Sequence, residues 1–347
     1  KLIQEDIRVF IDDIDGYIDE PIDIIVGGPP CQGFSQINQQ RIIDDPRNEL
    51  YKYFLMMVEK IAPKFVVMEN VKGMLKVADQ VVEDYGAIEI EKEGKILSYD
   101  VDFEILKSNE FSVAQNRERL IYIAIRNDIE EELNISPKDI FDNIHKANKN
   151  KPTYVLNDAL KDIKSLESPS EKNLNNVDSE IYGKKIDVNN YENHNNDYLD
   201  LINEGRKIPY VFNHKARYIN DTNREIFRRL DQGDDSTNEK IKDIMPYSNR
   251  NDVFKDKYFK LIADKPCRTI TAHMKFDCHS YIHPFEVRPL TPRESARIQS
   301  FPDDYFFLGA YTKTYMQIGN AVPPVMAREI ENVIKGFLQK KKKKNNS

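Results

Sequence analysis

One stretch near the N-terminus constrains the fold more than any other: a short apolar strand that runs into a stiff loop with a cysteine. The run 22–26 is apolar and rich in β-branched residues, which predicts a buried strand. Two glycines and two prolines fill positions 27–30, and Cys31 follows. Glycine allows a flat molecule to approach closely, and proline holds φ in one range. An isolated cysteine is most often buried filler. Open α/β sheets, however, bind ligands at the carboxyl ends of their strands. The pattern therefore predicts an α/β fold with a functional thiol at Cys31.

A second strand repeats this arrangement with a carboxylate in place of the thiol. Residues 48–61 predict a helix that Asn48 can cap and that packs against the sheet. The apolar residues at helical spacing are Leu50, Phe54, Met57, Val58 and Ile61. Pro63 ends this helix, and the apolar strand 64–71 then brings Glu69 to its C-terminal end. A lone glutamate there would be a solvated side chain, but its order after Cys31 favours a shared site.

A polar alternation leads into a third strand. Gln115, Arg117 and Arg119 are spaced two apart directly before the apolar run 120–125. A strand period of two places all three side chains on one face. The alternative is an ordinary polar edge strand. Between this strand and the previous one, 71–85 suggests a helix, 86–98 a polar turn-rich connection, and 99–106 a half-exposed strand.

Two further motifs lie near the C-terminus. Thr291, Pro292 and Glu294 form the signature of a helix start, with a cap, a proline at the first position and a carboxylate three residues after the cap. The segment 317–324 follows, and 326–338 predicts a closing helix. The lysines of 340–344 predict a solvated, disordered charge run.

Charge is distributed unevenly along the 347 residues. The net charge is −7, but residues 1–204 are acidic and residues 205–347 are basic. Tyrosine and phenylalanine are interleaved with the basic residues of 205–275, a composition typical of surfaces that grip phosphates and contact base edges. A solvated basic face is the alternative. Residues 127–204 are polar, and 174–196 in particular predicts long loops or partial disorder.

Cysteine and histidine usage argues against a metal or disulfide scaffold. The three cysteines include no Cys-x-x-Cys pair, which favours a reducing compartment. His273, Cys278, His279 and His283 lie close together, but their spacing fits no zinc pattern, so we expect no metal. No apolar run is long enough to cross a bilayer, and no leader pattern precedes the first strand. We therefore expect a cytoplasmic protein.

In this order, the five motifs resemble those of the C5-cytosine DNA methyltransferases. The resemblance implies a Rossmann-like, S-adenosylmethionine-dependent methyltransferase sheet with a smaller, irregular target-recognition domain. It implies that 1–126 is the first part of the catalytic domain and 127–285 the variable and target-recognition region. Residues 286–339 would return to the catalytic domain, and 340–347 would be a basic disordered tail.

The resemblance also implies a role for each matched residue. Cys31 would attack C6 of cytosine, Glu69 would bond N3, and Arg119 would hold O2. Arg117 would orient the site and help lower the pKa of the thiol. The residues implied to contact the cofactor S-adenosylmethionine are Asp6, Ile7, Pro30, Leu50, Asn320 and Ala321. Those implied to contact the substrate, double-stranded DNA, are Gln32, Ser35, Asn70 and Gln115.

One part of the family pattern has no counterpart in the sequence. The family begins with a Phe-x-Gly-x-Gly strand-turn and an acidic residue on the next strand, and here the matching pattern starts after both. Three explanations follow: a fragment, one subunit of a split enzyme whose partner chain supplies the first strands, or a catalytically silent DNA-binding subunit. Intact Cys31, Glu69, Arg117 and Arg119 argue against the third. Methylation of RNA cytosine by the same fold is a further alternative, although the large variable region favours duplex DNA. Bacterial restriction–modification would be the common setting.

Overall fold

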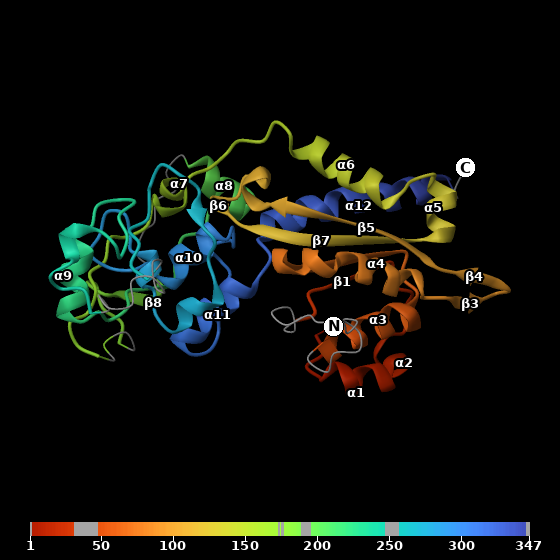
Figure 1. Cartoon of the computed structure of the whole chain (residues 1–347), viewed down its shortest axis with the longest axis horizontal. Helices are drawn as coiled ribbons and strands as arrows, with labels where there is room; N and C mark the ends of the chain where they lie inside the picture. The colour runs from red at the N-terminus through yellow and green to blue at the C-terminus, as the bar shows by residue number, and fades with distance from the viewer. Residues whose placement is uncertain are drawn as a thin grey trace. The chain divides into compact units, whose positions relative to one another are not determined.

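A computed structural model describes residues 2–30, 48–172, 174, 177–188, 196–246 and 257–344, and it divides the chain into two compact units (Figure 1). Unit 1 comprises residues 1–107, 118–150 and 329–347. Unit 2 comprises residues 108–117 and 151–328. Cys31, Gln32 and Ser35 lie outside the described residues, so the expectations for these three positions stay predictions.

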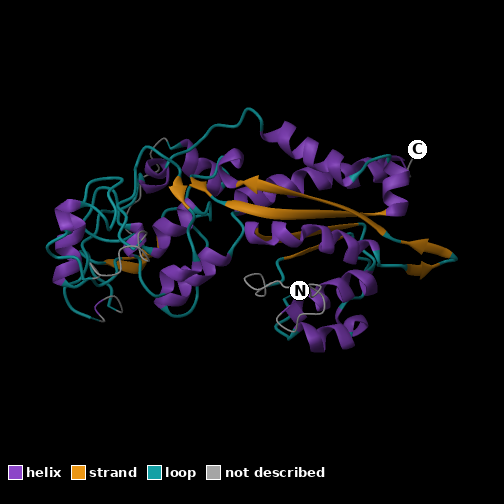
Figure 2. Ribbon diagram, viewed as in Figure 1, coloured by secondary structure: helices purple, strands orange, loops and turns teal. Residues whose placement is uncertain are grey.

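Unit 1 is built on a mixed four-stranded sheet in the order β1-β2-β7-β5 (Figure 2). The strands are β1 (Ile24–Gly27), β2 (Phe65–Val71), β5 (Tyr99–Lys107) and β7 (Glu118–Arg126). β1 runs parallel to β2, with Ile24 opposite Phe65, whereas β7 runs antiparallel to both of its neighbours. The positions of the sequence-predicted strands and the α/β class are therefore confirmed. The predicted burial of the first strand is wrong in part, because Val26 in β1 is 72% exposed.

Helices cover both faces of this sheet (Figure 1). Those of unit 1 before β5 are α1 (Ile7–Asp12), α2 (Ile14–Tyr17), α3 (Glu49–Ile61), the 3-10 helix η4 (Lys72–Val77) and α4 (Ala78–Gly86). The predicted helix over 71–85 is thus divided between η4 and α4. Residues 86–98 contain a short hairpin of β3 (Ile90–Lys92) and β4 (Lys95–Leu97), whose turn residue Gly94 has a φ of 75°. Glycine suits this left-handed conformation because it lacks a Cβ.

Helix α3 forms where the sequence predicts it but buries a different face. Its buried residues are Tyr51, Leu55 and Val58, whereas Leu50 is 40% exposed. The predicted inner face, which included Leu50, is therefore wrong in part. Two adjacent apolar stripes run along this helix, one through residues 50, 54, 57 and 61 and one through 51, 55 and 58. Periodicity alone cannot choose between the two stripes. The second stripe packs against the sheet, in one buried cluster with Val66, Met68 and Tyr122.

The polar segment after β7 is more regular than its composition suggests. It contains α5 (Asn127–Leu133) and α6 (Pro137–Asn148), both in unit 1. The side chain of Ser136 accepts from the backbone N–H of Asp139, whose carboxylate accepts from that of Ser136, so a capping box starts α6. These two helices were not predicted from the sequence. Local capping, rather than overall polarity, determines the structure here.

Unit 2 consists of short elements joined by long loops. Its two-stranded sheets pair β8 (Gly183–Asp187) antiparallel with β9 (Val211–Lys215), and β6 (Gln115–Asn116) parallel with β10 (Cys267–Arg268). Its α-helices include α7 (Leu156–Leu160), α8 (Asp197–Asn203), α9 (Asp221–Arg229), α10 (Pro292–Ile298) and α11 (Tyr311–Asn320). The 3-10 helices are η5 (Ser108–Phe111), η7 (Glu239–Ile241), η9 (Ala272–Lys275) and η10 (His279–Tyr281).

Buried charges organise the core of unit 2 around α10. The predicted capping box of Thr291 and Glu294 is confirmed, with Pro292 at the first helical turn. Arg288 Nη2 lies 2.6 Å from Glu294 Oε1, and Glu294 is fully buried. The ion pair with Arg288 holds the pKa of Glu294 well below its usual range, against the opposing effect of burial.

The closing helix α12 (Pro324–Lys344) extends further than predicted. Its backbone stays helical through the lysine run, so the expectation of disorder is wrong for 340–344. Lysine is a good helix former, and cations are favoured near the C-terminus of a helix. Residues 345–347 lie outside the described part of the chain.

Candidate active site

The candidate site of unit 1 lies where β1 and β2 end. Because the two strands run parallel, with Gly27 opposite Met68, the loop after β1 starts beside Glu69. A Cβ on Gly28 would lie 3.1 Å from Glu69 Oε2, and a Cβ on Gly27 would lie only 2.4 Å from the Phe54 ring. Larger residues at either glycine would therefore displace the glutamate or the helix behind it.

Glu69 is held by an arginine from the neighbouring strand. Arg119 Nε lies 2.7 Å from Glu69 Oε1, and both side chains are largely buried, at 14% and 19% exposure. Arg119 Nη1 also donates to the carbonyl of Glu118 at 2.7 Å. Burial lowers the pKa of Arg119 and Glu69 opposes this, but arginine stays protonated in proteins. The pair is therefore a fixed carboxylate–guanidinium unit.

The loop toward Cys31 is anchored by the residue after Glu69. The side-chain nitrogen of Asn70 donates to the carbonyl of Pro29 at 3.0 Å, and Asn70 is 6% exposed. Pro30, the last described residue of the loop, is exposed. Asn70 thus fixes the backbone two residues before Cys31. A substrate contact by Asn70 stays a prediction.

Gln115 and Arg117 do not share a strand with Arg119. Strand β6 ends at Asn116 and β7 begins at Glu118, so the predicted continuous strand is interrupted at Arg117. Arg117 is 1% exposed, and its guanidinium donates to the carbonyls of Ile270 at 2.8 Å and Gly319 at 2.9 Å. Both contacts lie within unit 2, and they link the backbone at Ile270 to the backbone at Gly319.

Gln115 reinforces the same junction of unit 2. Its side-chain oxygen accepts from the backbone N–H of Ile270 at 2.6 Å, and its amide nitrogen donates to Gln299 Oε1. Gln299 in turn donates to the carbonyls of Ile318 and Ala321 at the end of α11. Sequence spacing indicated neither Gln299 nor these carbonyl partners, because main-chain acceptors leave no residue-type pattern.

The predicted cofactor residues fall into two groups. Asp6, Ile7, Pro30 and Leu50 belong to unit 1, and Asn320 and Ala321 belong to unit 2. Asp6 caps α1 by accepting from the Arg8 backbone N–H at 3.0 Å, and both its oxygens also pair with the Arg8 side chain at 2.8 Å. This pairing holds the pKa of Asp6 well below its usual range. Exposed Pro30 and Leu50 offer apolar surface suited to a flat ring.

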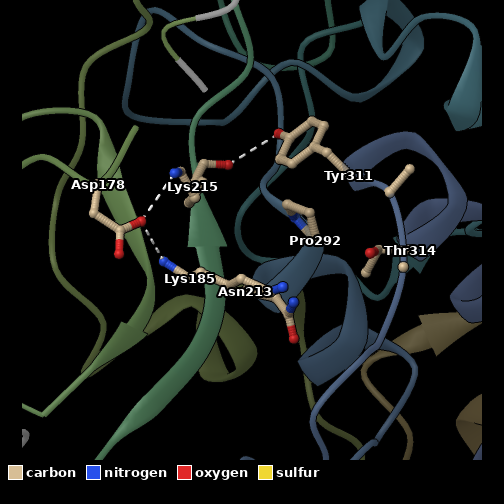
Figure 3. Close-up of a pocket in the computed structure, with 9 residues that line it drawn as sticks. Asp178, Lys185, Asn213, Lys215, Pro292, Tyr311 and Thr314 are labelled. Atoms are coloured by element: carbon tan, nitrogen blue, oxygen red, sulfur yellow. Dashed lines mark hydrogen bonds and ion pairs between the residues drawn. The ribbon is translucent and has the colours of Figure 1, made fainter. Parts of the chain in front are cut away.

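A separate cavity of about 460 Å³ lies in unit 2 between the β8–β9 sheet and α10–α11 (Figure 3). Its polar groups mainly satisfy one another. Lys215 Nζ lies 2.9 Å from Asp178 Oδ1, which also accepts from the backbone N–H of Lys185, and Tyr311 donates to the carbonyl of Lys215. This cavity includes none of the predicted site residues.

The fold and the polar strand ends of unit 1 define an α/β protein with a candidate active site at one edge of its sheet. The family model described as C-5 cytosine-specific DNA methylase matches residues 1–336, and the chain belongs to this family. The resemblance inferred from the motifs and the enzyme class are thereby confirmed.

Similar proteins agree with this assignment. The chain is 30% identical to the type II methyltransferase M.DdeI of Desulfomicrobium norvegicum, over 96% of this chain and 75% of that protein. It is 28% identical to the type II methyltransferase M.AgeI of Thalassovita gelatinovora, over 90% and 83%. A solved structure of an Escherichia coli prophage protein assigned to the DNA modification methyltransferases has a TM-score of 0.66 at 21% identity, over 97% and 86%, and supports the fold. None of these supports a separate complementing chain.

The described residues contain neither a metal-binding cluster nor a membrane-spanning helix. No group of three or more histidine, cysteine or acidic side chains there could hold a metal ion. No helix in this part of the chain is long and apolar enough to span a membrane.

Proposed function

We propose that this protein transfers a methyl group from S-adenosylmethionine to C5 of a cytosine extruded from a specific duplex DNA sequence, as part of a restriction–modification system. The observation that carries the proposal is the Glu69–Arg119 pair, at 2.7 Å, beside the glycine-proline loop that leads to Cys31. A largely buried carboxylate and guanidinium beside the loop that leads to a cysteine suit the ring of a pyrimidine.

The chemistry begins with the thiolate, because C5 of cytosine is a poor nucleophile until the ring loses its aromaticity. The Cys31 thiolate forms a bond to C6, and the displaced electron pair moves into the ring, where N3 takes up a proton. Glu69, which Arg119 holds in place at 2.7 Å, accepts a hydrogen bond from the protonated N3. Arginine has five N–H donors, so Arg119 can also hold the cytosine O2.

Methyl transfer and release complete the cycle. C5 takes up the methyl group that bound S-adenosylmethionine would supply. C5 then loses its proton to a base, the C6–sulfur bond breaks to regenerate the Cys31 thiolate, and N3 gives up the proton that it had taken. The cysteine therefore serves as a reversible nucleophile and is not consumed.

The predicted cofactor residues fit such a donor in part. Pro30 and Leu50 can pack against its adenine. Both oxygens of Asp6 already accept from Arg8, so a hydrogen bond from the adenine amine to Asp6 would be made in addition to that pairing. When bound, S-adenosylmethionine supplies an electrophilic methyl group. Asn320 and Ala321, at the end of α11, are proposed for its methionine end.

Access to C6 requires that the base leave the stack. Extrusion costs a few kcal/mol, which contacts in the pocket offset. The basic, aromatic composition of 205–275 supports DNA as the partner. Methylation of RNA cytosine is the alternative that the first experiment separates.

The proposal is tested by incubating the full chain with labelled S-adenosylmethionine and plasmid DNA, followed by bisulfite sequencing. We expect label in DNA, one methylated sequence context, and loss of transfer in Cys31→Ser. Cys267→Ala is the matched control, because burial raises the pKa of Cys267 to about 12 and keeps that thiol protonated. Methyl transfer that survives Cys31→Ser would show that Cys31 is not the nucleophile. Duplex DNA and RNA containing 5-fluorocytosine, which traps the covalent adduct, identify the substrate. Absence of both cofactor binding and transfer would favour the silent DNA-binding subunit.

A further inference from the structure

An exposed phenylalanine in unit 2 is surrounded by cationic and aromatic side chains. Phe276 follows η9 directly and is 61% exposed. Lys275 Nζ lies 4.6 Å from the centre of its ring, and the His273 ring centre lies 5.0 Å away at an angle of 59°. We call residues 273–276 the aromatic turn. A large apolar ring left in water costs free energy unless a partner covers it.

The backbone of the aromatic turn is held rigidly from within unit 2. Arg217 donates to the carbonyl of Met274 at 3.0 Å and to that of Phe276 at 2.6 Å. The Phe276 N–H donates to the carbonyl of His273 at 3.0 Å. The Met274 side chain is buried beneath the turn. Phe276 is therefore displayed on a stiff support.

The aromatic turn is connected to the backbone that Arg117 holds. A Cβ on Gly319 of α11 would lie 2.2 Å from the backbone of Thr271 and Ala272, so helix and turn are in close backbone contact. Arg117 holds the carbonyl of Ile270, one residue before Thr271. The aromatic turn thus follows closely after the backbone segment that Gln115 and Arg117 hold by hydrogen bonds.

The local charge suits a polyanion. The acidic residue next to the turn, Asp277, accepts from the backbone N–H of His279 at 3.3 Å, and its carboxylate lies 4.0 Å from the His279 ring. Two cations, Lys275 and Arg217, lie beside Phe276 and outnumber this one carboxylate.

Phe285 offers a natural comparison within the same unit. It is 60% exposed, almost as much as Phe276. Its ring lies 6.0 Å from that of His283, and Glu286 follows it in the chain. Among the cation–ring contacts of the described residues, one involves Phe276 and none involves Phe285.

We infer that Phe276 stacks on or inserts between the bases of bound duplex DNA, with Lys275 beside a backbone phosphate. The inference rests on the proposed DNA substrate, and it identifies a residue that contacts the bases. Apolar wedges that enter a base step are a known means of opening the stack, and aromatic side chains stack on any base. A ring fixed on a stiff turn loses little conformational entropy on binding.

Tryptophan fluorescence tests the contact directly, because the chain contains no tryptophan. Phe276→Trp and Phe285→Trp each introduce a single reporter at equally exposed positions. With sonicated plasmid DNA at low salt, we expect strong quenching of the first by base stacking and little change in the second. Equal quenching of both, or quenching of neither while DNA binds, would overturn the inference.

Affinity measurements supply the second test. We expect Phe276→Ala to weaken duplex binding by about tenfold or more, Phe276→Tyr to retain it, and Phe285→Ala to leave it unchanged. Lys275→Ala should lower the slope of log affinity against log salt by about 1. Circular dichroism confirms that each variant is folded. Unchanged affinity of folded Phe276→Ala would refute the base contact.

These results separate the two proposals. Quenching without methyl transfer would support the base contact and count against the proposed function. Methyl transfer without quenching would support the proposed function and count against the base contact. Failure of the wild-type chain to bind DNA would overturn both.

Discussion

Two arginines only two positions apart in the chain have different environments. Arg119 lies at the start of β7 and pairs with a carboxylate, whereas Arg117 is buried among main-chain carbonyls. A guanidinium can do either, because its planar donors match both kinds of acceptor. In our proposal Arg119 contacts the substrate, and Arg117 positions the backbone of unit 2.

At the residue scale, we predict that Glu69→Gln lowers single-turnover methyl transfer by about 100-fold or more. An amide cannot provide the charge that stabilises a protonated N3, and loss of one such electrostatic group commonly has an effect of this size. Glu118→Gln is the matched control, since the Glu118 carboxylate pairs with Lys72 at 2.8 Å and both side chains are partly exposed. It should change the rate less than about twofold. Similar losses in both variants would contradict a specific role for Glu69.

Only part of this site could be predicted from sequence. The sequence places Glu69 near the carboxyl end of its strand, where open α/β sheets bind ligands. Arg119 precedes its own strand, so the sequence alone does not place it at the same end of the sheet. The ion pair itself depends on the antiparallel register of β2 and β7, which no local pattern specifies. The period-two argument fails at Arg117, because the chain leaves one sheet for another between Asn116 and Glu118.

At the element scale, packing rather than propensity decides where glycine is needed. Gly319 lies in α11, where glycine is intrinsically unfavourable, yet a side chain there would meet the backbone of η9. Gly336 lies in α12, and a Cβ at this position would have no neighbouring atom within 4 Å. The two helix glycines therefore differ in their reason for being present.

We expect Gly319→Ala to destabilise unit 2 by about 3 kcal/mol, the upper range for overpacking against a surface that cannot yield. Gly336→Ala should instead stabilise by about 0.5–1 kcal/mol, because alanine is the better helix former. Urea unfolding followed by circular dichroism measures both. Equal effects of the two substitutions would show that α11 and η9 are not in close contact.

Helix α5 carries a titrating carboxylate. Burial and the neighbouring Asp100 raise the pKa of Glu130 from 4.5 to about 7. Because the folded state holds this proton more tightly, the resulting stability is full below pH 4.5 and is lost as pH rises through about 7. We predict that Glu130→Gln raises the melting temperature at pH 8 relative to wild type and changes it little at pH 4.5. Thermal unfolding at both pH values checks this, and an equal shift at each would exclude titration of Glu130 as the cause.

Elements were predicted best where local and tertiary preferences agree. The strands of unit 1 are short apolar runs with clear ends, and each was found within about two residues. Helices α5 and α6 were missed because their polar faces dominate the composition, while Ile140, Phe141 and Ile144 are buried. The face of α3 was ambiguous because both stripes are apolar.

At the scale of the whole molecule, the two units differ in their buried titratable groups. His214, His279 and His283 all belong to unit 2, and burial lowers the pKa of each to about 4. These histidines are therefore neutral in the folded state. Their contribution to stability is present above pH 6.5 and is lost as pH falls through about 4.

The units should consequently respond to acid in opposite directions. Between pH 8 and pH 5 we expect unit 2 to lose stability as its histidines resist protonation, and unit 1 to gain stability as Glu130 takes up its proton. Pulse proteolysis in urea with mass spectrometry assigns each cleavage to a unit and gives its unfolding midpoint. A shift of both unfolding midpoints in the same direction would contradict this view. Glu130→Gln should remove the gain in stability at low pH in unit 1 and leave unit 2 unchanged.

The interruption at Arg117 has a consequence for how such proteins can diversify. Arg117 and Arg119 belong to different units but are joined by two peptide links, a span of at most about 8 Å. A recombination that replaced residues 151–328 with the equivalent region of a relative would leave Arg117 behind, although its two carbonyl acceptors would come from the donor. Successful exchange of specificity should therefore require that the incoming backbone present acceptors in the same places, so that this short link limits which chimaeras remain viable.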